Sequence, residues 1–197
     1  TLAVEIDRCD DEAVRYAGRA TSGGALAIEL LDCLGPMLPV EEFDSPEALA
    51  AHFELLRGPG APPGRFRGVP APQLVRAAGV PGESLAAVLH VPAAAPFFAD
   101  HFPRRPVFPA TLLLEAQIRL ALQLAAEAPD RPPGTRPVPV RITHVKMRSF
   151  IPPGAVLTLD TQRAPTDGGT GRIMLKARAN DRTVATARLE YAPRRVA

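Results

Sequence analysis

Hydrophobic and polar residues follow two different periods along this chain of 197 residues, and the change of period divides it into segments. Alternation with a period of two, typical of half-buried strands, runs from Leu2 to Leu31 and again from Val140 to Tyr191. Between them, residues 110–126 are apolar on almost every side, which indicates a helix enclosed by other structure. The pattern therefore predicts an α+β protein in which one long apolar helix packs against strands.

The strands near the C-terminus are expected to form an antiparallel meander. The predicted strands are residues 140–150, 156–162, 172–179 and 183–191. Asp167-Gly168-Gly169 and Asn180-Asp181 lie between consecutive strands and have residue types that favour tight turns. The glycine-rich segment is accordingly interpreted as a hairpin turn rather than as a phosphate-binding loop.

The first strands resemble the last ones, which suggests a partial repeat. Leu2-Ala-Val-Glu-Ile-Asp-Arg8 is similar to Leu157-Thr-Leu-Asp-Thr-Gln-Arg163, and both are followed by further strands and polar turns. We expect residues 1–35 to be the C-terminal strands of an incomplete first domain, and the chain to be a piece of a longer protein. A second interpretation stays open, in which residues 1–35 add strands to a single sheet, because half-buried hairpins all share the period of two.

Residues 36–80 have a different composition and are expected to form a linker that contains one short helix. Ser45-Pro46 has the form of an N-cap followed by proline at the first helical position, and residues 47–57 follow a helical pattern. Residues 58–64, Gly-Pro-Gly-Ala-Pro-Pro-Gly, fit neither a helix nor a strand. Residues 81–197 then form a complete domain.

A histidine and a glutamate stand out as a candidate acid/base couple. His101 precedes Pro103, Pro106 and Pro109, which fix the backbone and make this loop stiff, so the helix is expected to start at Pro109 or the next residue. A histidine, with an ordinary pKa of about 6.5, is suited to accept a proton near pH 7. Glu115 falls in the second turn of the apolar helix, where burial favours the protonated form that a general acid needs.

The position of Arg119 complicates the assignment of Glu115 as an acid. Arg119 lies four residues after Glu115, which is the spacing of an ordinary surface ion pair, and a helical glutamate is more often a solvated charge. A neighbouring guanidinium favours the carboxylate, which is the wrong form for a general acid. Either Arg119 points elsewhere or the site is weakened.

Two segments resemble a known family. Residues 96–116, PFFADHFPRRPVFPATLLLEA, are similar to the active-site signature of the bacterial 3-hydroxyacyl-acyl-carrier-protein dehydratases, the hotdog-fold enzymes of fatty acid synthesis. Residues 140–154, VRITHVKMRSFIPPG, resemble that family's strand, phenylalanine and Pro-Gly turn. The resemblance covers residues 84–192. It implies a hotdog fold, with an antiparallel sheet wrapped around a long central helix, and a partial second hotdog at the N-terminus, as in a dehydratase region excised from a polyketide or polyunsaturated fatty acid synthase.

The resemblance also implies a role for each residue of the site. His101 is expected to remove the C2 proton of a 3-hydroxyacyl thioester, and Glu115 to protonate the departing 3-hydroxyl, which leaves a trans-2-enoyl thioester. The backbone N–H groups of Ala110 and Thr111 are expected to stabilise the enolate as its charge develops. The family usually has glycine where Ala110 stands and commonly has glutamine where Arg119 stands.

Further residues are expected around this site. The candidates for lining an acyl tunnel, which are equally compatible with core packing, are Phe97, Phe98, Phe108 and Leu112. The candidates for docking an acidic acyl carrier protein are Arg104, Arg105, Lys146 and Arg148, although scattered solvated charges would look the same. The family builds each site from two hotdogs, with the histidine from one and the acid from the other. A homodimer, or a pseudodimer with another hotdog, is therefore expected.

Composition and residue spacing argue against several other classes of protein. A net charge of +2 and only 5% aromatic residues do not favour a nucleic-acid binder. Charged residues interrupt the longest apolar stretch, so we expect no membrane span. Cys9 and Cys33 are interpreted as free thiols of a cytoplasmic protein. No His, Cys or Asp cluster has metal-ligand spacing, so neither a metal nor a cofactor is expected, and the substrate is carried on the phosphopantetheine of acyl carrier protein.

A function of a different class stays open. The chain is also compatible with a catalytically silent hotdog that acts as a scaffold or an acyl-binding module of a synthase. Three features allow this: the departures from the family at Ala110 and Arg119, and the missing front of the first hotdog. Double-bond isomerisation and thioester hydrolysis are further enzymatic possibilities for a hotdog fold.

Overall fold

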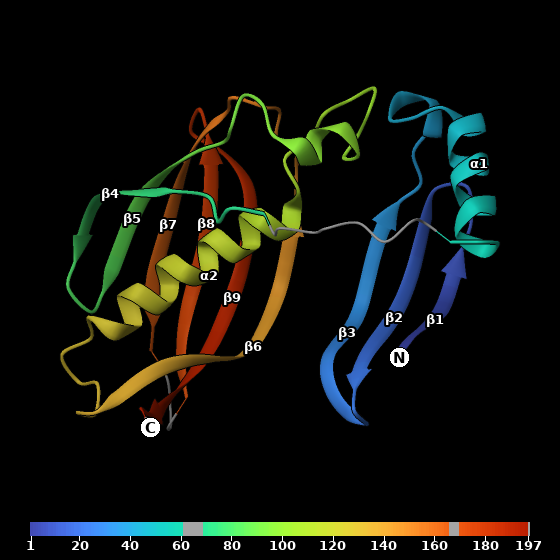
Figure 1. Ribbon diagram of the computed structural model, residues 1–197. Coiled ribbons are helices and arrows are strands. Elements are labelled where there is room, and N and C mark those ends of the chain that lie inside the picture. Colours follow the sequence, from blue (N-terminus) through green and yellow to red (C-terminus); the bar gives the residue numbers. More distant parts are fainter. Residues whose placement is uncertain (61–68, 166–169, 197) are drawn as a thin grey trace. The chain divides into compact units, whose positions relative to one another are not determined.

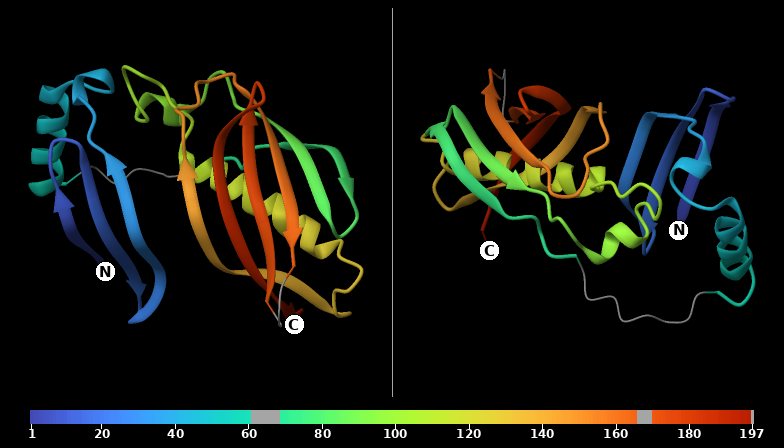
Figure 2. Two further views of the ribbon diagram at one scale, coloured as in Figure 1. Left: turned by 180° about the vertical axis from the view of Figure 1, so that it is seen from behind. Right: turned by 90° about the horizontal axis from the view of Figure 1, so that it is seen from above.

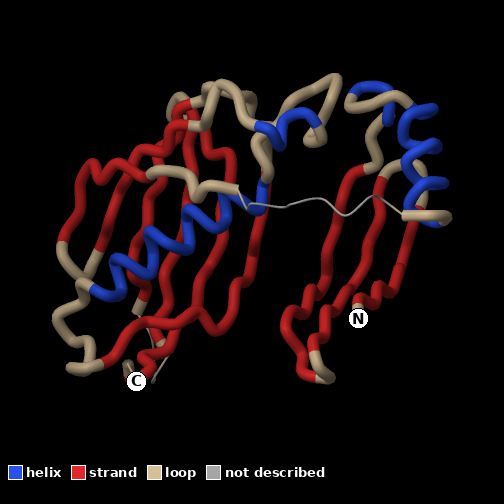
Figure 3. The backbone as a smooth tube through the Cα atoms, in the orientation of Figure 1, coloured by secondary structure: helices blue, strands red, loops and turns tan. Residues whose placement is uncertain are grey.

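The computed structural model describes residues 1–60, 69–165 and 170–196. The chain forms two compact units, Thr1–Ala61 and Pro62–Ala197. The strands form a three-stranded sheet and a six-stranded sheet (Figure 3).

The first unit is built on an antiparallel sheet with the strand order β1-β2-β3. Its strands are β1 (Leu2–Cys9), β2 (Ala13–Ser22) and β3 (Ala25–Pro36). A turn at Gly23 and Gly24 joins β2 to β3, and these glycines have positive φ angles of 56° and 79°. Glycine adopts this left-handed conformation without the steric cost that a side chain would add, so the residue type fits the turn.

The predicted short helix of the first unit is confirmed. Helix α1 spans Pro46–Arg57, with Ser45 as its N-cap. The Ser45 hydroxyl accepts a hydrogen bond from the backbone N–H of Ala48 at 3.3 Å, which satisfies one of the N–H groups that a helix start leaves unpaired.

The sheet of the first unit hydrogen-bonds only among its own three strands, so residues 1–35 do not extend the six-stranded sheet. One face of this sheet carries apolar side chains that residues 1–60 leave exposed: Leu2 is 83% exposed and Val4 is 68% exposed. Leu157 and Leu159 hold the corresponding positions of the proposed repeat, and both are completely buried. That residues 1–35 are the end of an incomplete hotdog stays a prediction.

The second unit contains the six-stranded antiparallel sheet, in the order β4-β5-β7-β8-β9-β6. Its strands are β4 (Leu74–Val80), β5 (Ser84–His90), β6 (Thr135–Met147), β7 (Val156–Ala164), β8 (Gly171–Ala179) and β9 (Arg182–Arg195). Helix α2 (Ala110–Ala126) lies across one face of this sheet, which curves around it (Figures 1 and 2). This arrangement confirms the predicted hotdog fold.

The core of the second unit lies between α2 and the sheet. Alternate residues of β5, β7, β8 and β9 are buried, and the intervening residues face away from the helix. The side chains with almost no exposure include Leu85, Leu89, Leu113, Leu120, Leu124, Leu157, Leu159, Ile173 and Leu189. Burial of a leucine side chain contributes about 1.5–3 kcal/mol, so this layer is the main source of stability for the unit.

Two boundaries differ from the sequence-based expectation. Residues 74–80, which were expected in the linker, form the edge strand β4. Only Leu74 of this strand is partly buried, so the strand lacks the alternation of period two that predicts a strand. Strand β6 begins at Thr135 rather than at Val140, and it includes Pro137 and Pro139. Proline is tolerated there because β6 is the other edge of the sheet, where one side of the strand needs no ladder hydrogen bonds.

The predicted hairpin at Asn180-Asp181 is confirmed. Both residues have positive φ angles, of 46° and 63°, and they join β8 to β9 through the pair Ala179 and Arg182. Asparagine and aspartate are favoured in two-residue turns of this kind. The predicted turn at residues 167–169 and the linker residues 61–64 lie outside the described residues. No helix in the described part of the chain is long and apolar enough to cross a membrane.

Gln117 yields a stability prediction. Its side chain is 1% exposed on the sheet-facing side of α2, and neither its amide nitrogen nor its amide oxygen has a hydrogen-bond partner in the described part of the chain. An unpaired buried amide costs about 1–3 kcal/mol, so we expect Gln117→Leu to stabilise the protein by an amount of this order in urea unfolding. Gln123→Leu, at an exposed position of the same helix, is the control and is expected to change stability by less than about 0.5 kcal/mol. Destabilisation by Gln117→Leu would mean that the amide has a partner in solution.

Candidate active site

His101 lies in the loop that leads into α2, and backbone hydrogen bonds hold it on both sides. Its N–H donates to the carbonyl oxygen of Phe97 at 2.9 Å, and its own carbonyl oxygen accepts from the N–H of Val107 at 2.9 Å. The imidazole ring stacks on the ring of Phe102, with 4.1 Å between ring centroids and 28° between planes. The ring is therefore held in place by local contacts before any ligand is present.

The surroundings of His101 favour the neutral imidazole. The residue is half-buried, and burial lowers the pKa of His101 below its ordinary value because the charged imidazolium loses hydration. Most of this side chain is then neutral near pH 7, and a neutral imidazole accepts a proton. This is the state that a general base requires.

Glu115 lies in the second turn of α2, as predicted, but on the side of the helix that does not face the sheet. Its side chain is 43% exposed, so the expectation of a helix enclosed on all sides was wrong for the described chain. The cause is the packing of α2 against a single sheet, which covers one face of a helix and leaves the opposite face to another partner or to solvent. This chain alone therefore does not bury Glu115 as the sequence led us to expect.

Arg119 does not point away from Glu115. Its Nε atom lies 2.7 Å from Oε1 of Glu115, and the geometry is that of an ion pair rather than of a well-aligned hydrogen bond. The guanidinium also donates through Nη2 to the carbonyl oxygen of Pro72, in the segment that precedes β4. The second oxygen of the carboxylate, Oε2, has almost no solvent exposure and, among the residues that the structure describes, no hydrogen-bond partner.

The start of α2 provides two backbone donors. Ala110 is the first helical residue after the N-cap Pro109, which confirms the predicted start of the helix. The N–H groups of Leu112 and Leu113 both bond back to the carbonyl oxygen of Pro109. The N–H groups of Ala110 and Thr111 come before Leu112, the first residue whose N–H bonds back to Pro109, so the helix gives them no partner, and the helix dipole adds positive potential at this end.

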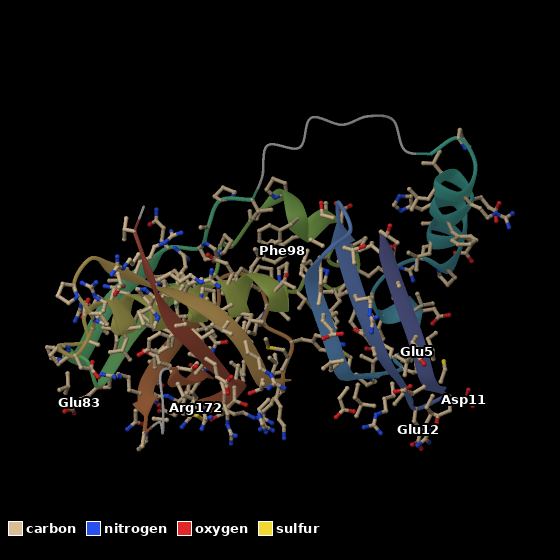
Figure 4. The ribbon with its side chains drawn as sticks, turned by 90° about the horizontal axis from the view of Figure 1, so that it is seen from below. Glu5, Asp11, Glu12, Glu83, Phe98 and Arg172 are labelled. Carbon is tan, nitrogen blue, oxygen red and sulfur yellow. The ribbon has the colours of Figure 1, made fainter. Side chains whose placement is uncertain are left out.

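The aromatic residues proposed for an acyl tunnel gather beside this loop. Phe98 and Phe108 are buried in the core, and Phe97 and Leu112 pack against it. The ring of Phe97 lies 4.5 Å from that of Phe98 and 6.2 Å from that of Phe108, measured between centroids. Phe98 lies on the side of the sheet that carries α2 (Figure 4). Their role in lining a tunnel stays a prediction.

The four basic residues proposed for docking occupy different places. Arg104 is exposed in the His101 loop, and the guanidinium of Arg105 lies over the ring of Phe150, 4.7 Å from its centroid. Arg148 follows β6, and its backbone N–H donates to the carbonyl oxygen of Val184 at 2.8 Å.

Lys146 belongs to a different surface. It lies near the end of β6, opposite Thr186 of β9, which in turn pairs with Lys176 of β8. Paired residues share one face of a sheet, so Lys146 and Lys176 lie on the solvent side, the side away from α2. Arg172 lies on this side too (Figure 4).

Within the described residues, His101 and Glu115 form no hydrogen bond with each other, and no group of three His, Cys, Asp or Glu residues lies close enough to hold a metal ion. Cys9 and Cys33 are free thiols.

Two contacts of the candidate site were missed from the sequence. The stacking of Phe102 on His101 could have been suspected from their adjacency alone. The anchoring of Arg119 to Pro72 had no signal, because 47 residues separate the two and the acceptor is a backbone carbonyl.

Comparison with known proteins adds a family to this geometry. A model of the ApeI-like dehydratases matches residues 79–188, more than half of the chain. The 3-hydroxyacyl-[acyl-carrier-protein] dehydratase FabZ of Ruminiclostridium cellulolyticum is 31% identical over 112 residues, 57% of this chain and 78% of that protein. FabZ of Albidiferax ferrireducens is 32% identical over 118 residues, 59% of this chain and 79% of that protein. The crystal structure of AziG from S. sahachiroi matches 62% of this chain and 92% of AziG with a TM-score of 0.51 and 13% identity, a likeness of fold alone.

The lowered pKa of His101 can be measured by NMR titration of the histidine ring signals, with His101→Asn used to assign the resonance. We expect a midpoint below the ordinary value of about 6.5. As the pH falls, His101 of the unfolded chain is protonated before His101 of the folded protein. The free energy of unfolding therefore decreases as the pH falls from the ordinary pKa of histidine through the lowered pKa of His101. A midpoint at or above 6.5 would contradict the burial argument.

Proposed function

Because the chain belongs to the ApeI-like family of dehydratases, we propose that it removes water from a 3-hydroxyacyl thioester on acyl carrier protein and releases the trans-2-enoyl thioester. We propose that this reaction is a step of fatty acid synthesis, which the similarity to the FabZ dehydratases supports. A polyketide or polyunsaturated fatty acid synthase is a further setting that we propose for it. The observation that carries the proposal is that one family match spans both His101 and Glu115.

The elimination requires a base at C2 and an acid at the 3-hydroxyl. His101 is proposed to take the C2 proton, because its imidazole is neutral near pH 7 and is held by the Phe97 and Val107 hydrogen bonds. The electrons of the C2–H bond form the C2–C3 double bond as the C3–O bond breaks. Glu115 is proposed to give its proton to the departing oxygen, so that the leaving group is water.

Negative charge develops on the thioester carbonyl oxygen while the C2 proton is leaving. The N–H groups of Ala110 and Thr111 are proposed to stabilise this charge, since they come before Leu112, the first residue whose N–H bonds back to Pro109. A backbone donor is unaffected by the replacement of the family's usual glycine with Ala110, provided that φ is negative, as it is in a helix.

A second hotdog is proposed to complete each site. Glu115 lies on the face of α2 turned away from its own sheet, and it forms no hydrogen bond with His101 of the same chain. Both facts agree with an arrangement in which His101 of one hotdog works with the Glu115 equivalent of another. A homodimer or a pseudodimer would supply that partner.

The charge of the second unit supports an acidic carrier as the partner. Residues 62–197 hold 19 of the 23 Lys and Arg residues but only 9 of the 21 Asp and Glu residues, so the net charge of +2 conceals a basic second unit. Acyl carrier proteins are acidic, and complementary charge mainly accelerates encounter. We propose Arg104, Arg105 and Arg148 as the docking residues nearest the His101 loop, with Lys146 on the adjoining sheet face.

The dehydration is tested by incubating the protein with a 3-hydroxyacyl group on carrier protein and following the loss of water by mass spectrometry. We expect His101→Ala and Glu115→Gln each to lower kcat by about 10²-fold or more, because each removes a proton-transfer group. Glu127→Gln is the matched control, since Glu127 lies at the other end of α2 and pairs with Arg76. Unchanged turnover in His101→Ala would refute the mechanism, and no product from the natural chain would favour a silent scaffold.

Docking is tested by comparing carrier-bound substrate with the same acyl group on free pantetheine. We expect the double variant Arg104→Glu, Arg148→Glu to lower kcat/KM by about tenfold or more on the carrier-bound substrate and to leave the pantetheine substrate unchanged, because only the carrier contributes the acidic surface. Arg136→Glu, an exposed position at the other end of β6, is the control for a simple change of net charge. Equal losses on both substrates would place these arginines in the chemistry or in folding instead.

A further inference from the structure

The first unit contains a sheet but no buried core. Within residues 1–60 no residue is buried, and helix α1 is no exception. Burial of apolar side chains is the main free-energy gain that offsets the conformational entropy lost on folding. A unit of this size that buries none of them lacks this gain, so its sheet requires a further layer of polypeptide.

The apolar side chains of this sheet share one face. Residues that pair across strands lie on the same face, and so do alternate residues of a regular strand. This set, which we call the apolar face, consists of Leu2, Val4, Ile6, Tyr16, Gly18, Ala20, Ile28, Leu30 and Cys33. The opposite face carries charge, because Glu5, Arg19 and Glu29 lie together there. The sheet is therefore amphipathic, and a further layer of polypeptide belongs on its apolar side.

The rows of paired residues on the apolar face repeat in the second unit. In the partial repeat, Val4 corresponds to Leu159. The row across β1, β2 and β3 consists of Val4, Gly18 and Leu30. The matching row across β7, β8 and β9 consists of Leu159, Ala177 and Ala185. This second row is completely buried in the layer between the sheet and α2, whereas Val4 is 68% exposed (Figure 1).

The sizes of the side chains on the apolar face favour a helix as the covering element. Gly18 and Ala20 place little side-chain volume on the middle strand, as Ala177 does in the layer under α2. Small residues there allow a helix to approach closely, while larger side chains of the outer strands pack along its flanks. A second sheet packs about 10 Å away, and large side chains from both sheets fill this spacing. The face therefore matches a helix better than the sheet of a second copy.

We propose that the apolar face is a docking surface for an apolar α-helix from polypeptide outside these 197 residues, and that this helix lies across β1–β3 as α2 lies across β7–β9. The helix presents leucine and alanine on one side, as α2 does with Leu113, Ala116, Leu120, Ala121 and Leu124. Its docking gives the first unit the buried layer that residues 1–60 lack. The proposal concerns an interaction surface and is independent of the dehydration.

A synthetic peptide of residues 109–129 serves as the probe, because it contains the helix that covers the matching strands. The fluorescently labelled peptide is titrated with the complete 197-residue protein, and binding is followed by anisotropy. We expect saturable binding, together with slower hydrogen exchange of the amides of β1–β3 measured by mass spectrometry, because the docked helix stabilises this sheet. The same peptide with Leu120→Pro is expected not to bind, since proline breaks the helix.

Val4→Glu and Ala3→Glu form a matched pair, because these neighbouring residues of β1 point to opposite faces. We expect Val4→Glu to weaken peptide binding by about tenfold or more, because the docked helix would bury an unpaired charge. Ala3→Glu is expected to change the affinity by less than about twofold. Leu30→Glu, on the other outer strand of the apolar face, is expected to behave as Val4→Glu does. Circular dichroism verifies that each variant keeps its strands.

Several results would overturn the proposal. Absence of binding up to about 100 μM peptide is one, and equal losses in Val4→Glu and Ala3→Glu, or exchange protection confined to the second unit, are others. Self-association of the natural protein that Val4→Glu abolishes would assign the apolar face to a second copy instead. Protection of β1–β3 without peptide, if it is lost in Phe53→Glu, would assign the face to α1, whose Phe53 side chain is exposed.

Discussion

The packing of one apolar helix against a curved antiparallel sheet is the constraint on which the rest of the second unit depends. Leu113, Leu120 and Leu124 of α2 are completely or almost completely buried against the alternating apolar residues of the strands. Since one sheet covers only one face of a helix, this packing also decides which residues of α2 are left for function. Gln117 is consequently turned into the core, whereas Glu115, two positions earlier, is turned away from it.

The same packing fixes the loop that carries His101. Phe98 and Phe108 are part of the core on either side of this loop, and the N–H of Phe108 donates to the carbonyl oxygen of Ile151 at 2.7 Å. The loop is therefore attached to the core before and after the histidine, and the prolines between these points limit its freedom further. A site built in this way loses little conformational entropy when it binds substrate, which favours catalysis by pre-positioned groups.

Charge is distributed unevenly in this chain, and the uneven distribution matters more than the small net value. The basic second unit suits an acidic carrier, whereas in the site itself a single cation, Arg119, lies beside the candidate acid. From the sequence this arginine argued against Glu115 as an acid. In the structure its Nε lies 2.7 Å from Oε1 of Glu115, and its Nη2 donates to the carbonyl oxygen of Pro72, so the two residues form an ion pair as their spacing indicated.

The sequence by itself determined the start of α2, the α1 cap and the Asn180-Asp181 turn, because periodicity, proline and turn preferences act over a few neighbouring residues. The hotdog fold came from the resemblance of residues 96–116 and 140–154 to a known family, since the periodicity alone predicted only a helix packed on strands. It also singled out His101 and Glu115 as candidates. It could not determine that the edge segment 74–80 is a strand, that Glu115 is half-exposed, or that Pro72 anchors Arg119. These features depend on contacts between segments far apart in the chain, and such contacts leave no local pattern, so only the tertiary structure decided them.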